Sequence, residues 1–379
     1  MRISFICGSL ASGMDGVGDY TRCLARACVE AGHECLLISI NDCERASEID
    51  GSLQIERYKS ALHDTQAVAD IFNRIRSWQP TWISLQFVPF AFHSRGLIKQ
   101  LLPFISRLRE EAALEVMFHE LWLGEKPSLS FKHKILGWVQ KKQLLQALRI
   151  WSPDCIHTSN TLYQNILARH GHSARRLPLF GNIAITPPTS DTLKELLEWY
   201  PPKANERVIL FPFSQSTEWD VQRSLDFLKK VSDAASVSLR LIQVGKNTSG
   251  QEHWRRIPEL AQRHGWSCDI LGARSQEVLS QLMHFSDLGV SASNIQLADK
   301  SGAIVAMLEH GLPVLCTTQE RESKHPVMQT KTDRLFDLSN SSEAVIDLLK
   351  KDLKPTAESR LQKVAKQWLA DLGEITRGG

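Results

Sequence analysis

Three short stretches of this sequence carry side chains and backbone patterns suited to binding phosphate groups or sugars. The first is Gly13-Met14-Asp15-Gly16-Val17-Gly18-Asp19, which lies between an apolar run and an amphipathic run. A helix starting there would offer unbonded amides and the positive end of its dipole, and Gly16 and Gly18 would let a ligand approach the backbone. A dinucleotide-binding fingerprint needs a third glycine where Thr21 stands. The pattern therefore predicts either contact with an anion or sugar, or only a tight turn.

The second stretch is Phe118-His119-Glu120, at the carboxyl end of an expected strand. An imidazole beside a carboxylate can hydrogen-bond sugar hydroxyls or orient an acceptor, so His119 and Glu120 are the candidate catalytic residues. A zinc-protease pattern is excluded, because Leu123 occupies the position of its second histidine. The alternative is a surface histidine beside a helix cap.

The third stretch is Lys300-Ser301-Gly302, which precedes an apolar helix-like run ending at Gly311. Ser301 is a good N-cap residue, Gly302 leaves the first amides accessible, and Lys300 adds a positive charge. Together they predict a binding site for a diphosphate. An ordinary capped helix with a solvated lysine is the alternative.

These stretches lie in a regular alternation of apolar runs and amphipathic segments, which is typical of a parallel sheet with helices on both faces. The expected strands are 3–7, 35–40, 82–87, 114–118, 154–158, 176–180, 208–212, 238–244, 268–271, 287–291 and 313–317. The expected helices are 19–31, 66–78, 96–111, 130–150, 161–170, 217–231, 251–264, 275–285, 301–310, 342–351 and 356–372. In such sheets ligands bind at the carboxyl ends of the strands, where loops meet helix N-termini.

The alternation breaks at 181–189 and again at Pro201-Pro202, where proline pairs stop helices. A length of 379 residues suits about two domains. We therefore expect a doubly wound α/β chain with two domains that join near residue 182.

Composition limits the class of protein. Hydrophobic residues make up 42% and charged residues 23%, which excludes a disordered or collagen-like chain. Lys and Arg number 45 against 42 Asp and Glu, so the basic excess typical of nucleic-acid-binding proteins is missing. The sequence has no run of 18 apolar residues, and its opening residues suit a core strand better than a signal peptide. Its eight cysteines show no C-x-x-C spacing, so we expect buried thiols and no metal site.

The order of these features resembles the GT-B glycosyltransferases, and most of all the retaining glycosyltransferase family 4. The resemblance extends over nearly the whole chain, and its last stretch is the most specific. It rests on Gly16-Val17-Gly18-Asp19-Tyr20 with the helix after it, on Phe118-His119-Glu120, on Leu271-Gly272-Ala273-Arg274 through Ser291, and on Ser301-Gly302 through Val314.

The resemblance implies two Rossmann-like domains facing across a cleft. Residues 1–182, joined by the terminal helix at 356–379, would bind the acceptor, and 183–355 would bind a nucleotide-diphosphate sugar. The transfer would need no metal and no cofactor besides this co-substrate, and it would retain the anomeric configuration. The helix dipole and basic side chains would stabilise the departing diphosphate.

The resemblance also implies roles for individual residues. Gly16 and Gly18 would approach the donor phosphates, and His119 would touch the transferred sugar. The family's arginine and lysine after the first strand of the donor domain are missing from 213–220. We name Lys246 and Lys300 as substitutes. The expected donor-binding residues are Gly16, Gly18, Gly245, Lys246, Asp299, Lys300, Ser301 and Gly302.

The chain departs from the family most clearly at two glutamates of the donor site. Their positions are occupied by Ala298 and Ala306. Asp299 is the nearest acid that could contact sugar hydroxyls. We expect Glu309, one turn beyond Ala306, to be a solvated charge at the end of its helix.

Residues 126–149 combine six basic side chains with interleaved apolar ones and contain no acid. The segment predicts either an amphipathic helix on anionic lipid, suited to a lipid-linked acceptor, or a core-packed helix with a solvated basic face. We expect a cytoplasmic protein. If the segment is a lipid-bound amphipathic helix, the protein would also contact the inner face of the membrane peripherally.

The sequence thus favours a glycosyltransferase acting on a glycan or lipid-linked acceptor. Two alternatives stay open. One is a nucleotide-sugar isomerase or hydrolase on the same fold. The other is a non-catalytic partner protein with this fold, which the missing glutamates would suit.

Overall fold

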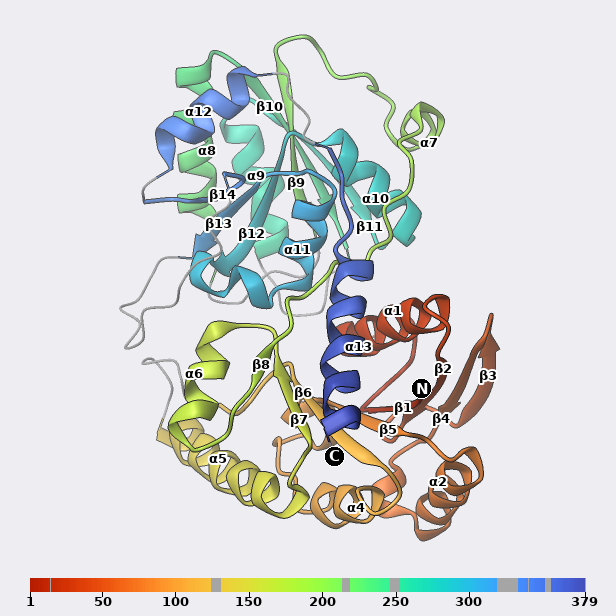
Figure 1. Ribbon diagram of the computed structural model, residues 1–379. Helices are drawn as coiled ribbons and strands as arrows, with labels where there is room; N and C mark the ends of the chain where they lie inside the picture. Colours follow the sequence, from red (N-terminus) through yellow and green to blue (C-terminus); the bar gives the residue numbers. More distant parts are fainter. Residues whose placement is uncertain are drawn as a thin grey trace. The chain divides into compact units, whose positions relative to one another are not determined.

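The computed structural model describes residues 1–13, 15–123, 131–212, 219–245, 253–318, 333–339, 341–351 and 356–378. The chain divides into two compact units. Unit 1 comprises Met1–Pro178 with Leu361–Gly379, and unit 2 comprises Leu179–Arg360. The chain thus leaves unit 1 once and returns to it for its last helix (Figure 1).

The described residues of unit 1 form an eight-stranded sheet in the order β3-β4-β2-β1-β5-β6-β7-β8. All neighbouring pairs are parallel except β3 and β4, which form an antiparallel hairpin. The strands are β1 (Arg2–Cys7), β2 (Glu34–Ser39), β3 (Ala46–Asp50), β4 (Leu53–Arg57), β5 (Trp82–Phe87), β6 (Ala113–Phe118), β7 (Cys155–Thr158) and β8 (Arg175–Arg176).

Helices cover both faces of this sheet (Figure 1). Helices α2, α4 and α5 pack on one face through residues such as Phe72, Phe104 and Leu144. On the other face α13 lies beside α1, and Trp368 of α13 stacks on Phe5 of β1 with ring centroids 5.4 Å apart. The helices are α1 (Gly16–Glu30), η1 (Ala61–His63), α2 (Thr65–Trp78), α3 (Pro89–Phe92), α4 (Leu101–Leu108), α5 (Phe131–Trp151), α6 (Thr161–Arg169) and α13 (Leu361–Gly378).

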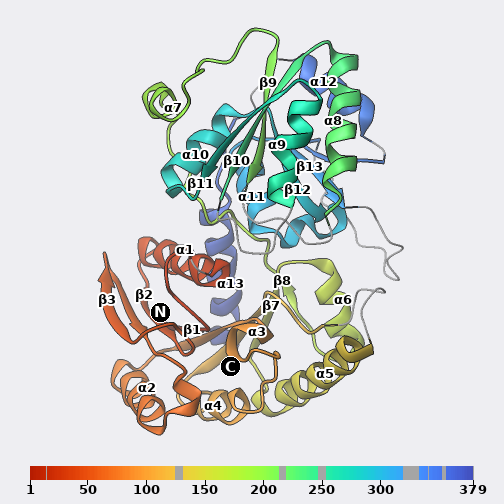
Figure 2. The same cartoon turned by 180° about the vertical axis from the view of Figure 1, so that it is seen from behind.

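In unit 2 the described residues form a six-stranded parallel sheet in the order β11-β10-β9-β12-β13-β14. Figure 2 shows α8, α9 and α12 together on one face, and α10 and α11 cover the other. The strands are β9 (Glu206–Pro212), β10 (Ser238–Val244), β11 (Ser267–Gly272), β12 (Leu288–Asn294), β13 (Val314–Thr318) and β14 (Leu335–Asp337). The helices are α7 (Ser190–Leu196), α8 (Val221–Ala235), α9 (His253–Arg263), α10 (Gln276–Phe285), η2 (Ile295–Lys300), α11 (Gly302–Glu309) and α12 (Ser342–Lys350).

The expected fold class, two α/β domains each built on a doubly wound parallel sheet, is confirmed. Some elements differ from expectation. The strand expected at 176–180 is only the two-residue β8. The helix expected from Gly96 starts later, at Leu101, because Gly96 has a φ of 62°, a left-handed value that a helix start does not accept.

Candidate active site

The glycine-rich stretch of unit 1 folds as the loop after β1 and the first turn of α1. Asp15 is the N-cap residue, and its carboxylate accepts hydrogen bonds from the amides of Val17 and Gly18, each at 3.3 Å. A Cβ atom at Gly18 would lie 2.3 Å from the carbonyl oxygen of Ser9, so close packing on the loop requires glycine. Space around Gly16 is open to 4 Å. Packing therefore accounts for Gly18, and contact of Gly16 or Gly18 with a donor stays a prediction.

The loop before α1 is fixed by side-chain hydrogen bonds to both the amide and the carbonyl oxygen of Leu10. Asp42 accepts the Leu10 amide at 2.9 Å and the Ser9 hydroxyl at 3.2 Å, while Arg22 donates from Nε to the Leu10 carbonyl oxygen at 3.0 Å. Burial acts to raise the pKa of Asp42. Hydrogen bonds that its carboxylate accepts, among them those from the Leu10 amide and the Arg57 guanidinium, outweigh burial and hold the pKa at about 2. The loop is therefore rigidly placed by an ionised carboxylate.

Two further acids lie at the start of α1. The amide of Gly13 donates to Oδ1 of Asp19 at 3.0 Å, and Asp15 caps the helix. Burial raises the pKa of Asp15 and of Asp19. The helix dipole here is already partly neutralised by its own cap, so a phosphate group would meet negative charge as well as amides.

His119 follows β6 directly and is buried. Its amide donates to the Phe87 carbonyl oxygen at 3.1 Å, and its Nε2 lies 2.9 Å from Oε1 of Gln86. The ring packs edge-on against Tyr20 of α1, with centroids 4.8 Å apart, so the structure brings the first two candidate stretches together. Burial lowers the pKa of His119 to about 3, so the ring is neutral near pH 7. Glu120 is half-buried, and its role stays a prediction.

The third candidate stretch begins α11 in unit 2. Ser301 is the N-cap residue, and its Oγ accepts the amide of Ile304 at 3.4 Å. The amides of Gly302 and Ala303 make no hydrogen bond to any residue that the structure describes. Ser301, Gly302 and Ala303 are half-buried, and the atom nearest to a Cβ at Gly302 would be Oδ1 of Asn182, at 3.8 Å. Within the described residues, two amides at this helix N-terminus are therefore left without an acceptor, as the start of an anion-binding helix requires.

The other donor candidates of unit 2 lie after β10 and within η2. Gly245 has a φ of 129°, which favours glycine, and its amide donates to the Gly272 carbonyl oxygen at 2.8 Å. Asp299 and Lys300 end η2 and are half-buried. Lys246 lies outside the described residues. Donor binding by these residues stays a prediction.

The positions of the missing glutamates are buried and apolar. Ala298 and Ala306 are both buried, and a Cβ atom at Gly181 would lie 2.9 Å from Cα of Ala306. The expectation that Glu309 is solvated is wrong, because its side chain is 3% exposed. It accepts hydrogen bonds from the amides of Gly181 and Arg360, and burial raises its pKa. Glu309 therefore anchors the two ends of unit 2.

Helix α5 buries one face and exposes another. Phe131, Ile135 and Trp138 lie on the exposed face at 77%, 49% and 61% exposure, spaced four and three residues apart. We call this face, with its flanking lysines, the α5 patch: Phe131, Lys132, Lys134, Ile135, Trp138 and Lys142. The buried face comprises Gly137, Gln140, Leu144, Ala147, Leu148 and Trp151. The core packing and the exposed basic face of the second alternative both occur on this helix, and contact with a membrane stays a prediction. Residues 126–130 lie outside the described residues.

Two absences concern only the described part of the chain. None of the helices described there combines the length and hydropathy that a membrane-crossing helix needs. No group of three or more His, Cys, Asp or Glu side chains in the same residues is arranged to hold a metal ion.

Sequence reasoning missed the polar residues that support these stretches, namely Asp42, Arg22, Ser84, Gln86 and Glu115. One signal was available. Ser84 and Gln86 are polar residues within the apolar run of β5, and Glu115 interrupts β6 in the same way. A polar residue in a strand buried on both faces needs a partner, and so marks a network.

The sequence matches no protein-family model, and none of the curated proteins matches it either. Solved structures with the same fold do exist. Sucrose-phosphate synthase from Thermosynechococcus elongatus aligns with a TM-score of 0.62 at 15% identity, covering 100% of this chain and 98% of that one. HepE from Anabaena, in complex with UDP and glucose, aligns with a TM-score of 0.60 at 13% identity, covering 98% and 99%.

A third similar structure is a candidate UDP-N-acetylglucosamine 2-epimerase from Listeria monocytogenes, with a TM-score of 0.56 at 11% identity over 100% of this chain and 97% of that one. At these identities the likenesses establish the fold alone. The chain has the GT-B fold, which confirms the resemblance at the level of architecture; membership in family 4 stays a prediction.

Proposed function

We propose that this protein is a glycosyltransferase that moves a sugar from a nucleotide-diphosphate sugar to a glycan or lipid-linked acceptor. The observation that carries the proposal is the start of α11, where the half-buried residues Gly302 and Ala303 have amides that make no hydrogen bond among the described residues. Leaving-group charge develops on the diphosphate during transfer, and amides already oriented by a helix stabilise such charge. Lys300, Asp299 and Gly245, together with Lys246, complete the proposed donor site.

The transferred sugar is proposed to lie at His119. The lowered pKa indicates a neutral imidazole. Such a ring can form hydrogen bonds with sugar hydroxyls and does not take up a proton near pH 7. Glu120 is proposed to contact the acceptor. We propose a transfer without metal and with retention of configuration, which follows the family resemblance rather than any distance in the structure.

A lipid-linked acceptor is supported by the α5 patch. Three large apolar side chains are exposed on one face of the helix, and basic residues surround them. Lys142 lies with Nζ 5.7 Å from the ring centroid of Trp138. Such a face suits the interface of an anionic bilayer, where the rings enter the headgroup region and the lysines meet lipid phosphates. We therefore propose peripheral membrane contact through 126–149 on the cytoplasmic side.

The test is release of nucleoside diphosphate from a panel of nucleotide sugars, with and without anionic vesicles carrying polyprenyl-linked glycans. Transferase activity requires that product release depends on acceptor. His119→Ala should lower the rate and leave the thermal unfolding temperature within a few degrees of wild type. Equal rates for His119→Ala and wild type would contradict the site assignment.

A second candidate is a nucleotide-sugar isomerase or hydrolase. The epimerase-like neighbour and the apolar residues at Ala298 and Ala306 favour it. This candidate turns over donor without acceptor, so the acceptor-free reaction separates the two. Calorimetry with nucleoside diphosphates at millimolar concentration separates both from a non-catalytic protein, which would show no binding.

A further inference from the structure

A row of buried polar side chains crosses the sheet of unit 1 on the face that α13 covers. We call it the polar row: Gln86 and Ser84 on β5, Glu115 on β6 and His157 on β7. All four side chains are fully inaccessible to solvent. A polar network this deep is stable only when every donor meets an acceptor, so its hydrogen bonds fix which atoms carry protons.

The polar row is continuous from α13 to His119. His157 Nε2 lies 3.1 Å from Oδ2 of Asp371, and its Nδ1 lies 2.9 Å from Oε1 of Glu115. Oγ of Ser84 lies 2.5 Å from Oε2 of Glu115. Gln86 continues the row, with Nε2 2.7 Å from that Oγ and Oε1 2.9 Å from Nε2 of His119.

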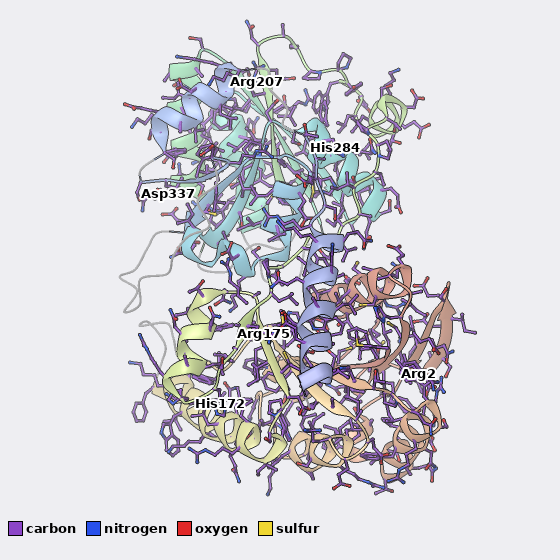
Figure 3. All side chains as sticks on the ribbon, in the orientation of Figure 1. Arg2, His172, Arg175, Arg207, His284 and Asp337 are labelled. Atoms are coloured by element: carbon purple, nitrogen blue, oxygen red, sulfur yellow. The ribbon has the colours of Figure 1, made fainter. Side chains whose placement is uncertain are left out.

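The row begins with a positive charge. Burial acts to lower the pKa of His157, but hydrogen bonds to Asp371, Cys155 and Glu115 outweigh it and raise the pKa to about 11. His157 is therefore an imidazolium near pH 7, and both of its nitrogens donate. Asp371 is held as a carboxylate by the same bond and by Nη1 of Arg175, 2.7 Å from its Oδ1; Figure 3 labels Arg175 beside α13.

The hydrogen bonds along the row favour one arrangement of protons. Glu115 accepts the Nδ1 proton of the imidazolium at Oε1, and Ser84 donates its one hydroxyl proton to the other oxygen, Oε2. The Ser84 oxygen then accepts from the amide nitrogen of Gln86. This turns the carbonyl oxygen of Gln86 toward His119. Because that oxygen only accepts, Nε2 of the neutral His119 ring carries the proton and Nδ1 carries the lone pair.

We propose that Glu115 is a positioning residue for the transfer site, which acts through Ser84 and Gln86 to hold His119 as the Nε2–H tautomer. Within the described residues Nδ1 of His119 makes no hydrogen bond, so it is the atom left for substrate. In this tautomer His119 accepts a hydrogen bond from a sugar hydroxyl and has no proton to give it. The substrate part of this inference rests on the proposed function; the tautomer does not.

The tautomer can be measured without any substrate. Full-length protein labelled with ¹⁵N-histidine is examined by NMR near pH 7, and the His119 signals are identified by their loss in His119→Gln. Wild type should show a protonated Nε2 and an unprotonated Nδ1. Ser84→Ala leaves Gln86 without a fixed direction, so the Nδ1–H tautomer should gain population.

Ser4→Ala is the matched control, because Ser4 is also fully buried in this sheet and its Oγ makes no hydrogen bond within the described residues. It should leave the His119 signals unchanged. Gln86→Met is a second variant, which removes the acceptor for Nε2–H and leaves Glu115 and His157 in place. It should also release the Nδ1–H tautomer.

An Nδ1–H or charged His119 in wild type would overturn the proposal, as would an unchanged tautomer in folded Ser84→Ala and Gln86→Met. In transfer assays Ser84→Ala should lower kcat about tenfold relative to Ser4→Ala, since one oriented hydrogen bond is lost. If wild type has the Nε2–H tautomer and both variants release the Nδ1–H tautomer, but the protein transfers no sugar, the proposed function fails and the positioning of His119 through the polar row stands.

Discussion

Nε2 of His157 on β7 lies 3.1 Å from Oδ2 of Asp371 on α13, so that the last helix is bonded directly to a charge inside the sheet. The two residues are 214 positions apart in sequence. Opposite charges raise the pKa of His157 and lower that of Asp371, and these directions agree with a buried ion pair. We therefore expect the docking of α13 to depend on pH.

Stability should fall as pH rises above neutrality. The folded pKa of His157, about 11, exceeds the unfolded value near 6.5, so its contribution is complete below about pH 6.5 and is lost progressively toward pH 11. Urea unfolding at pH 7 and 9.5 should show wild type losing up to about 1.4 kcal/mol per pH unit from this group. Asp371→Asn should be less stable at pH 7 and show a smaller decrease. Equal slopes in the two proteins would mean that His157 does not hold this charge.

Trp368→Ala should destabilise unit 1. The Trp368 side chain is fully buried and stacks on Phe5, so its removal leaves a large cavity and should cost about 3–5 kcal/mol. Lys366→Ala, on the exposed face of the same helix, should change the free energy of unfolding by less than about 0.5 kcal/mol. Chemical denaturation measures both. A similar loss in the two variants would show that α13 contributes little to the core.

Asp15→Asn should raise the affinity for a nucleoside diphosphate if donor phosphates reach α1. Asparagine caps a helix about as well as aspartate, so the amides of Val17 and Gly18 keep an acceptor. Removing one negative charge about 4 Å from a phosphate removes about 1 kcal/mol of electrostatic repulsion in water. This corresponds to a dissociation constant about fivefold lower. Calorimetry gives the constants. Unchanged affinity would place the phosphates away from α1.

Lys300→Ala should weaken binding of a nucleoside diphosphate by roughly tenfold or more, because a hydrogen bond to a charged group contributes about 1.5–3 kcal/mol. Lys350→Ala on α12, an exposed lysine of the same unit, is the control. Both variants should unfold at the wild-type temperature. If they bind equally, the start of α11 is an ordinary helix cap.

Replacing Phe131 and Trp138 by serine should weaken binding to vesicles of phosphatidylglycerol by about tenfold and leave stability unchanged, because both rings are exposed. Ile150→Ser removes an exposed apolar side chain at the other end of α5 and serves as the control. Vesicle co-sedimentation measures binding. Loss in the control equal to loss in the double variant would contradict a localised patch.

The alternation of apolar and amphipathic runs was enough to predict most of the fold, because buried parallel strands and the helices between them follow local rules. Strands β5 and β10 have the expected bounds, 82–87 and 238–244. The hairpin of β3 and β4 was not predicted, since β3 is an edge strand with Ser47, Glu48 and Asp50 among its five residues. Such a strand buries no continuous apolar face.

The site was predictable where a local rule applied and not where distant residues meet. Ser301 caps α11 as expected, because capping depends on the next three residues. Burial of Glu309 depends on Gly181 and Arg360, which the sequence alone does not bring together. The polar row was not predictable for the same reason. The partners of Glu115 are known only once β5, β6 and β7 are placed side by side in the sheet.

Because α13 belongs to unit 1, this unit cannot be completed in the order in which the chain is made. The ribosome synthesises residues 179–360 before it reaches Trp368 and Asp371. Phe5 therefore lacks its contact with Trp368, and His157 its contact with Asp371, until the whole of unit 2 has been synthesised. Until then the nascent sheet carries an uncovered aromatic ring, and His157 has Glu115 as an acidic partner but still lacks Asp371. Unit 2 can thus fold first, and folding of the protein ends when α13 packs onto unit 1, the unit whose synthesis began first.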